Sequence, residues 1–301
     1  MESKSRIKTT LLLIVAVLVG LFILLPLLLS FFSSEASAKV ALIPLEGVLS
    51  NTPGTVFGDT ATSANTIINF LAQANENPSI KAIVLQINSP GGTPVATDEV
   101  ATAIKNSPKP VIAFIKDVGA SSGYWIASST EYIIANRMSI TGSIGVFSSY
   151  LEFSGLMDKY GVGYERLVAG EYKDMGVPYR KLTSKEKALL QSHLDQMQQF
   201  FIAEVAENRN LPESEVRRLA TGEVFLGVQA LELGLIDQVG NIDTVKDYLA
   251  QQYGLADITF LTYQQKPGLF DLLTGMAAHF SFSIGEGLGS TLFQTEQTTL
   301  I

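Results

Sequence analysis

The sequence contains no cysteine among its 301 residues. A disulfide framework, a thiolate nucleophile and a cysteine-ligated metal are therefore excluded. Histidine is almost as scarce, because His193 and His279 are the only two in the chain. Any site that needs a histidine base has to use one of them, and the sequence predicts neither a metal site nor a cofactor.

Positive charge is also in short supply, and the formal net charge is −8. Residues 1–8 hold a local excess of two positive charges, from Lys4, Arg6 and Lys8 against Glu2, which leaves −10 on the rest of the chain. A surface with this much negative charge repels a phosphate backbone, and nucleic acid is therefore not a predicted partner.

Charge is absent altogether from residues 11–32, which read LLLIVAVLVGLFILLPLLLSFF. A helix of this length spans roughly 30 Å, the thickness of a bilayer core. A buried core helix is the weaker alternative, since such helices rarely lack a polar face. The segment is therefore predicted to be a transmembrane anchor.

A cleaved signal peptide is the closer alternative to an anchor, because Ala36-Ser37-Ala38 fits a cleavage site. The apolar run is about twice the length of a usual signal-peptide core, which favours a retained anchor. In both cases the basic flank stays in the cytoplasm. We therefore expect a cytoplasmic N-terminus at 1–10, a single-pass anchor in the cell membrane at 11–32 and an extracytoplasmic catalytic domain at 39–262. The tail at 263–301 is expected to be peripheral, an oligomer contact or flexible.

The exported part alternates short apolar runs with segments of helical periodicity, a pattern typical of α/β layers around one sheet. A long amphipathic helix is expected later in the chain, at 185–208. The predicted strands are 39–49, 82–87, 110–115 and 131–135, and the predicted helices between them are 64–74, 93–105 and 124–129. A break is expected after the second strand, at 88–92.

Gly119-Ala-Ser121-Ser-Gly123 has the G-x-S-x-G form and lies between a predicted strand and a predicted helix. A tight turn there exposes the hydroxyl of Ser121, and the helix start offers free N–H groups to a developing oxyanion. The pentapeptide alone also allows Ser121 or Ser122 to be no more than a helix N-cap.

A nucleophilic serine needs a base. His193 lies in a polar helix and His279 in an apolar tail, so neither is well placed. A lysine can serve if burial lowers its pKa, and Lys173 is a candidate. Most loop lysines are surface charges, and the adjacent Asp174 could hold this one protonated.

Four motifs in this order resemble the signal peptide peptidase SppA family of Ser/Lys proteases, and the resemblance runs from about Val40 to Gly240. It implies a Clp-protease/crotonase-like fold, a repeated ββα spiral, because the late element Ala230-x-x-x-Gly-Leu-Ile-Asp237 is shared with that wider group. The motifs are Ser89-Pro-Gly-Gly92, Ala120-Ser-Ser-Gly-Tyr124, Thr141-Gly-Ser-Ile-Gly-Val146 and Tyr172-Lys-Asp174.

The resemblance implies that Ser121 is the nucleophile, that Lys173 is the general base and that Ser143 hydrogen-bonds the lysine. It places the oxyanion hole in the backbone N–H groups of Gly92 and Ser122, with Gly91 allowing a close approach.

Two positions depart from the family pattern. Many relatives have glycine where this chain has Ser122, and many have serine where Val177 precedes Pro178. Neither change removes a group that the proposed chemistry needs.

By the same resemblance, the substrates are leftover signal peptides and hydrophobic or misfolded segments at the membrane. A homo-oligomeric ring is implied, an octamer in which neighbouring chains supply the serine and the lysine of one site. Three rivals remain open. An α/β-hydrolase esterase would need one of the two histidines, a non-catalytic scaffold would need neither Ser121 nor Lys173, and export disfavours an acyl-CoA enzyme of the crotonase type.

Overall fold

A computed structural model of the chain describes residues 17–20, 22, 37–52, 54–56 and 59–264. Its contacts divide the chain into two units, Met1–Thr262 and Tyr263–Ile301. In the part described, no helix combines the length and the apolar character needed to cross a bilayer. The predicted anchor at 11–32 lies outside the described residues except for 17–20 and 22, and so does the predicted tail beyond residue 264.

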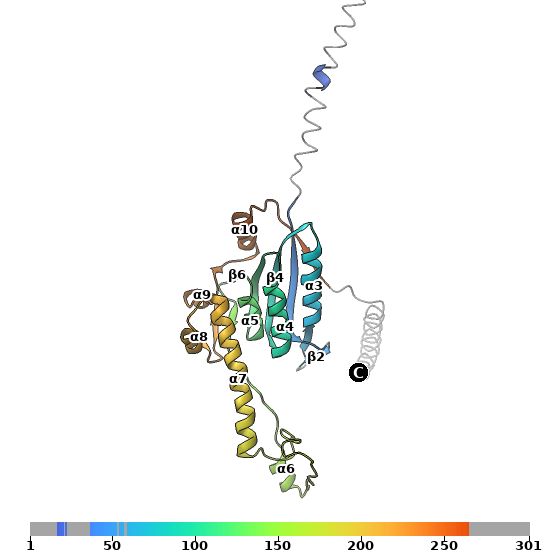
Figure 1. Cartoon of the computed structure of the whole chain (residues 1–301), viewed down its shortest axis with the longest axis vertical. Helices are drawn as coiled ribbons and strands as arrows, with labels where there is room; N and C mark the ends of the chain where they lie inside the picture. Colours follow the sequence, from blue (N-terminus) through green and yellow to red (C-terminus); the bar gives the residue numbers. More distant parts are fainter. Residues whose placement is uncertain (1–16, 21, 23–36, 53, 57–58, 265–301) are drawn as a thin grey trace, which may run out of the picture. The chain divides into compact units, whose positions relative to one another are not determined.

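Strands and helices alternate along the described chain (Figure 1). The order is β1 (Lys39–Ser50), β2 (Gly54–Val56), β3 (Asp59–Ser63), α3 (Ala64–Glu76), β4 (Ile80–Gly92), α4 (Pro94–Lys105), β5 (Val111–Ala120), α5 (Ser122–Ser128), β6 (Tyr132–Ala135), β7 (Ile140–Gly142), α6 (Ser154–Lys159), α7 (Ser184–Arg209), α8 (Glu213–Leu219), β8 (Val224–Leu226), α9 (Gly227–Glu232), β9 (Gln238–Val239), α10 (Ile242–Tyr253) and β10 (Thr259–Thr262).

The described strands form one sheet, in which β1, β4 and β5 run side by side and parallel. β5 changes partner along its length, because Ile112–Ile115 pair with β6 and Val118–Ala120 pair with β7. β1 does the same, pairing with β10 at its start and with β3 at its end. The prediction of α/β layers around one sheet is confirmed, and most of the strand pairs are parallel.

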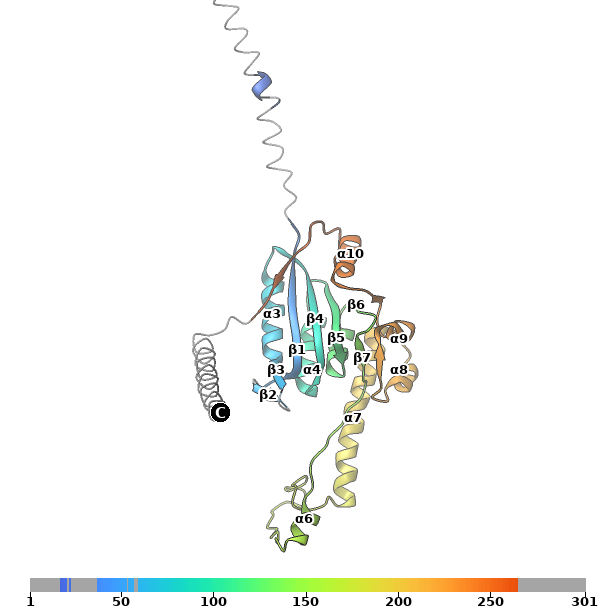
Figure 2. The same cartoon turned by 180° about the vertical axis from the view of Figure 1, so that it is seen from behind.

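Both faces of the central strands are covered, which explains why β4 carries the continuous buried run from Ala82 to Leu85. Helices α3, α4 and α5 lie on one face, in front of the strands in Figure 1 and behind them in Figure 2. On the opposite face, Val245 and Leu249 of α10 pack against Val84 and its neighbours.

The break expected at 88–92 is wrong, because β4 continues through Gly92. Glu46 pairs with Asn88 and Val48 pairs with Gly91, so Ser89 and Pro90 stand opposite a single residue of β1. This is a β-bulge, and a bulge accommodates a proline that cannot donate to the ladder. The other predicted strands and helices are confirmed within a few residues at their ends, although β5 extends five residues further, to Ala120.

The C-terminal end of α7 is fixed to the sheet by an ion pair that is largely buried. Arg209 donates from Nη1 and Nη2 to the two carboxylate oxygens of Asp237, at 2.9 and 2.7 Å. Asp237 also accepts the N–H of Ile133 in β6 at 2.7 Å. Close by, the buried hydroxyl of Tyr124 in α5 donates to the carbonyl of Leu235 at 2.8 Å.

Replacing Asp237 with Ala is expected to lower the free energy of unfolding by about 3 kcal/mol, because Arg209 would be left charged and poorly solvated. Urea unfolding of the full chain measures the change. Glu215→Ala is the matched control, since Glu215 forms an exposed ion pair with Arg218. Equal unfolding midpoints for the two variants would contradict a structural role for the buried pair.

Candidate active site

The turn between β5 and α5 presents Ser121. Its φ of 52° and ψ of −121° are strained for a residue with a side chain. Backbone bonds hold this geometry, because the Ser121 N–H donates to the Gly142 carbonyl at 2.8 Å and the Ser121 carbonyl accepts from Tyr124 at 2.9 Å. Ser121 occupies the N-cap position of α5, yet its side chain makes no capping hydrogen bond. The alternative in which its hydroxyl serves only as a helix cap is therefore wrong.

Two glycines of β4 give the serine its clearance. Gly91 has φ of +135°, and a Cβ built on it would lie 3.0 Å from Cβ and 3.3 Å from Oγ of Ser121. A Cβ on Gly92 would lie 2.2 Å from the carbonyl oxygen of Leu49. A side chain at Gly91 would crowd the nucleophile, and one at Gly92 would force β4 away from β1.

The N–H groups of this region divide between the sheet and the site. The N–H of Thr93 donates to the Leu49 carbonyl of β1 at 2.9 Å. The backbone N–H groups of adjacent strand residues point to opposite sides, so the N–H of Gly92 points away from β1. The hydroxyl of Ser122 donates to the Gly92 carbonyl at 3.2 Å, which places Gly92 against the first turn of α5. Gly91 differs, because its N–H already donates to Oγ of Ser89 at 3.2 Å.

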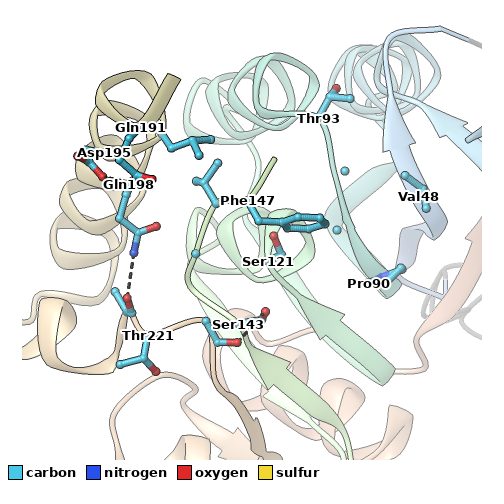
Figure 3. A pocket seen from close by; sticks show the side chains of 17 residues that line it. Val48, Pro90, Thr93, Ser121, Ser143, Phe147, Gln191, Asp195, Gln198 and Thr221 are labelled. Carbon is cyan, nitrogen blue, oxygen red and sulfur yellow. Dashed lines mark hydrogen bonds between the residues drawn. The ribbon is translucent and has the colours of Figure 1, made fainter. Parts of the chain in front are cut away.

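Ser143 lies on the same cavity as Ser121 (Figure 3). It also has a positive φ, 52°, and its N–H donates to the carbonyl of Glu223 at 2.7 Å. Its hydroxyl donates to the carbonyl of Gly222 at 3.3 Å. The structure thus brings Ser121, Ser143, Gly91 and Gly92, four of the residues that the family resemblance singles out, to one cavity.

Two cavities meet at Ser121. One, of about 690 Å³, also contains Ser143. The other, of about 740 Å³, is mostly apolar. Phe147 lies on both, and the exposed ring is drawn beside Ser121 in Figure 3. The described residues that line the apolar cavity include Trp125, Val146, Leu190, Leu194, Met197 and Phe201.

Sequence reasoning missed that α7 forms a wall of this site. Apolar residues recur at helical spacing on the otherwise polar helix, at 190, 194, 197 and 201, and this pattern was the available signal. Gln198 adds a polar contact, because its amide donates to the Ala220 carbonyl at 3.0 Å, next to the loop that binds Ser143. His193, expected on a solvated face, is exposed but borders the apolar cavity. His279 lies outside the described residues.

Lys173 is not brought to Ser121 within one chain. None of the described residues that line the two cavities is a lysine. Lys173 is exposed and lies in residues 149–183, here called the arm, which contains α6. Figures 1 and 2 both show α6 near the N-terminal end of α7, away from α5. A complete Ser/Lys site would therefore need an arm from elsewhere.

Asp174 does not pair with its neighbour Lys173. Arg166 donates to both oxygens of the Asp174 carboxylate at 2.7 Å, and Arg180 does so at 3.0 and 2.9 Å. These hydrogen bonds, from Arg166 first, hold the pKa of Asp174 well below its ordinary value. Arg180 also binds Glu186, and together with the N–H of Thr183 it lowers the pKa of Glu186 to about 2.

Comparison with known proteins identifies the family. The sequence profile of Peptidase family S49 matches residues 103–256, which include Ser121, Ser143 and Lys173. The chain belongs to peptidase family S49. It is therefore a serine peptidase of a Ser/Lys dyad family. A Clp protease profile matches residues 57–144 of this S49 peptidase.

Similarity to individual proteins supports the family assignment. The S49 peptidase is 32% identical over 289 residues to a candidate protease of Methanocaldococcus jannaschii, covering 93% of this chain and 92% of that one. It is 31% identical over 233 residues to a candidate signal peptide peptidase SppA of Enterococcus faecium, covering 76% and 68%. It is 32% identical over 208 residues to the chloroplastic serine protease SPPA of Arabidopsis thaliana, covering 68% and 31%.

The arm of the S49 peptidase should loosen in acid. Asp174 and Glu186 have lower pKa values when folded than when unfolded, so their stabilisation is complete above pH of about 4.5 and is lost as the pH falls toward 2. Because the chain has no cysteine, Leu167→Cys gives a unique attachment point for a spin label on a side chain that is 96% exposed.

Electron paramagnetic resonance should show the label at 167 becoming more mobile between pH 4.5 and 2. A label at Glu232→Cys, in α9, is the control and should change less over the same interval. Identical pH responses at both positions would contradict the assignment of the acid-sensitive contacts to the arm.

Proposed function

We propose that this S49 peptidase is a membrane-anchored endopeptidase in which Ser121 is the nucleophile and Lys173 is the general base. The observation that carries the proposal is the geometry of Ser121. Its hydroxyl makes no capping bond, its backbone is strained, and it lies where two cavities meet. Strain of this kind is characteristic of catalytic turns between a strand and a helix.

In the proposed reaction, Oγ of Ser121 bonds to the carbonyl carbon of a peptide, and the neutral amine of Lys173 takes the hydroxyl proton. The ammonium so formed gives that proton to the leaving nitrogen as the C–N bond breaks. Water then attacks the acyl-serine ester, Lys173 takes a proton from the water, and Ser121 regains its hydrogen as the acid product leaves.

The backbone supplies the electrostatic part of this mechanism. The N–H of Ser122 belongs to the first turn of α5, where no intrahelical acceptor is available, and Gly92 faces the same turn. These two N–H groups form the proposed oxyanion hole. Gly91 contributes clearance, since its own N–H is engaged by Ser89. Ser143 would accept or donate a hydrogen bond to the amine of Lys173 once that amine reaches the cavity.

The lysine is proposed to come from a second copy of the chain. Lys173 is exposed, and the arm around it shows large apolar side chains to solvent, including Leu151, Leu156, Tyr160 and Leu167, from 56% to 96% exposed. A surface of this kind is usually covered by a partner. Covering it against the cavity of a neighbour would also desolvate the amine and favour its neutral form. A closed ring, an octamer by the family resemblance, would give every chain both roles.

The apolar cavity suits apolar peptide side chains, so leftover signal peptides and hydrophobic or misfolded segments are the proposed substrates. Such substrates arise at the membrane, which fits the rest of the proposal. Residues 11–32 are proposed to anchor the peptidase in the cell membrane, and residues 39–262 to lie outside the cytoplasm. The partner switching of β1 and β5 supports a repeated ββα spiral of the Clp-protease type.

Ser121→Ala and Lys173→Arg are each expected to lower kcat for peptide hydrolysis at least about a thousandfold, because one removes the nucleophile and the other the titratable base. Hydrolysis by the full chain in detergent measures both. His193→Ala is the control. It should change KM, because His193 borders the apolar cavity, and retain most of kcat. A dead His193→Ala enzyme beside an active Lys173→Arg enzyme would favour the esterase-type alternative.

Mixed assemblies test where the base comes from. Chains with Ser121→Ala and chains with Lys173→Ala should each be inactive alone and should recover a clear fraction of wild-type activity when co-expressed. Two different affinity tags, used in sequence, isolate the mixed assemblies. Mixed assemblies without activity would favour a serine and a lysine from the same chain.

A further inference from the structure

Arg180 occupies the centre of the arm's charge cluster. Its Nε and Nη2 donate to Asp174 at 3.0 and 2.9 Å, and its Nη1 and Nη2 donate to Glu186 at 2.9 and 2.6 Å. The Arg180 side chain is 18% exposed. A planar guanidinium can hold two carboxylates at once in this forked geometry, whereas a lysine ammonium cannot.

The two carboxylates belong to different parts of the site. Asp174 directly follows Lys173. Glu186 is the third residue of α7, is 3% exposed at its side chain, and closes a capping box by accepting the N–H of Thr183 at 2.8 Å. Arg180 therefore ties the turn of Lys173 to the first turn of α7. The same helix carries Leu194 in the wall of both cavities, so one rigid element links the lysine turn to the pocket.

The cluster also keeps the neighbouring carboxylate, that of Asp174, from pairing with Lys173. Two guanidiniums, from Arg166 and Arg180, occupy the carboxylate of Asp174. Among the described residues, no carboxylate makes an ion pair with the amine of Lys173. Without Arg180, Arg166 alone would hold the carboxylate of Asp174, and the link from that carboxylate to Glu186 of α7 would be lost. A carboxylate beside the lysine would favour the ammonium, which is the wrong form for a base.

We propose that Arg180 is the positioning residue of the general base, an inference that rests on the proposed role of Lys173. It holds the lysine turn in a fixed place on α7 and, together with Arg166, keeps Asp174 away from the amine. Its effect belongs to the chain that supplies the lysine. Arg180 does not touch the substrate, so its loss should lower kcat and leave KM near the wild-type value.

The test uses full-length chains in mixed assemblies. The reference pairs a serine-supplying chain, which carries Lys173→Ala, with a lysine-supplying chain, which carries Ser121→Ala. Adding Arg180→Gln to the lysine-supplying chain should lower kcat about a hundredfold, the usual effect of a small displacement of a catalytic group. Adding it to the serine-supplying chain should leave the reference activity in place. Arg180→Lys in the lysine-supplying chain should not restore activity, because the ammonium cannot form the double fork.

Arg218→Gln is the matched control, since Arg218 makes an ion pair with Glu215 at an exposed site on α8 and should have no effect in either chain. An equal loss from Arg180→Gln in both chains would show a role in folding or assembly alone and would overturn the inference. Full activity in both would overturn it as well. If the reference mixture itself is inactive, the proposed sharing of a site between chains fails, and the role of Arg180 fails with it.

Discussion

The strained turn that joins β5 to α5 is the constraint on which the rest of the site depends. A residue with a side chain holds φ of 52° there only because its N–H and carbonyl are both bound by neighbouring elements. That turn exposes the hydroxyl of Ser121 and points the first N–H groups of α5 at the same space. Gly91 must lack a side chain for the hydroxyl to stand clear, and the β-bulge opposite Gly47 places Gly91 there.

The groups of the proposed mechanism lie in two separate parts of the chain. The parallel sheet brings together the ends of β4, β5 and β7, which supply Ser121, Ser143 and the backbone donors. It does not bring Lys173 to them. The proposed base lies in the arm, which Arg180 ties to Glu186 of α7. The sheet therefore builds the acyl-transfer half of the site, and α7 connects it to the arm that would serve a neighbouring chain.

Much of this organisation could be predicted from the sequence, because local patterns determine it. The apolar runs of β1 and β4, the G-x-S-x-G turn and the helical spacing in α7 are local signals, and each was confirmed. Contacts that depend on how the chain folds were not predictable. The continuation of β4 through Pro90 depends on pairing with β1, and the engagement of Asp174 by Arg166 and Arg180 depends on the folded arm. From the sequence alone, an Asp174 that held Lys173 protonated was an open alternative.

The central claim is that the amine of Lys173 meets the hydroxyl of Ser121 across two chains. A chain without cysteine allows the most direct measurement, since Ser121→Cys in one copy and Lys173→Cys in another are the only thiols in a mixed assembly. A short bis-maleimide should join these two positions between chains, and mass spectrometry of the digest should identify the linked peptides. Assemblies that form but give no such link would contradict the claim. So would a chain that carries both Ser121→Cys and Lys173→Cys and is linked only within itself.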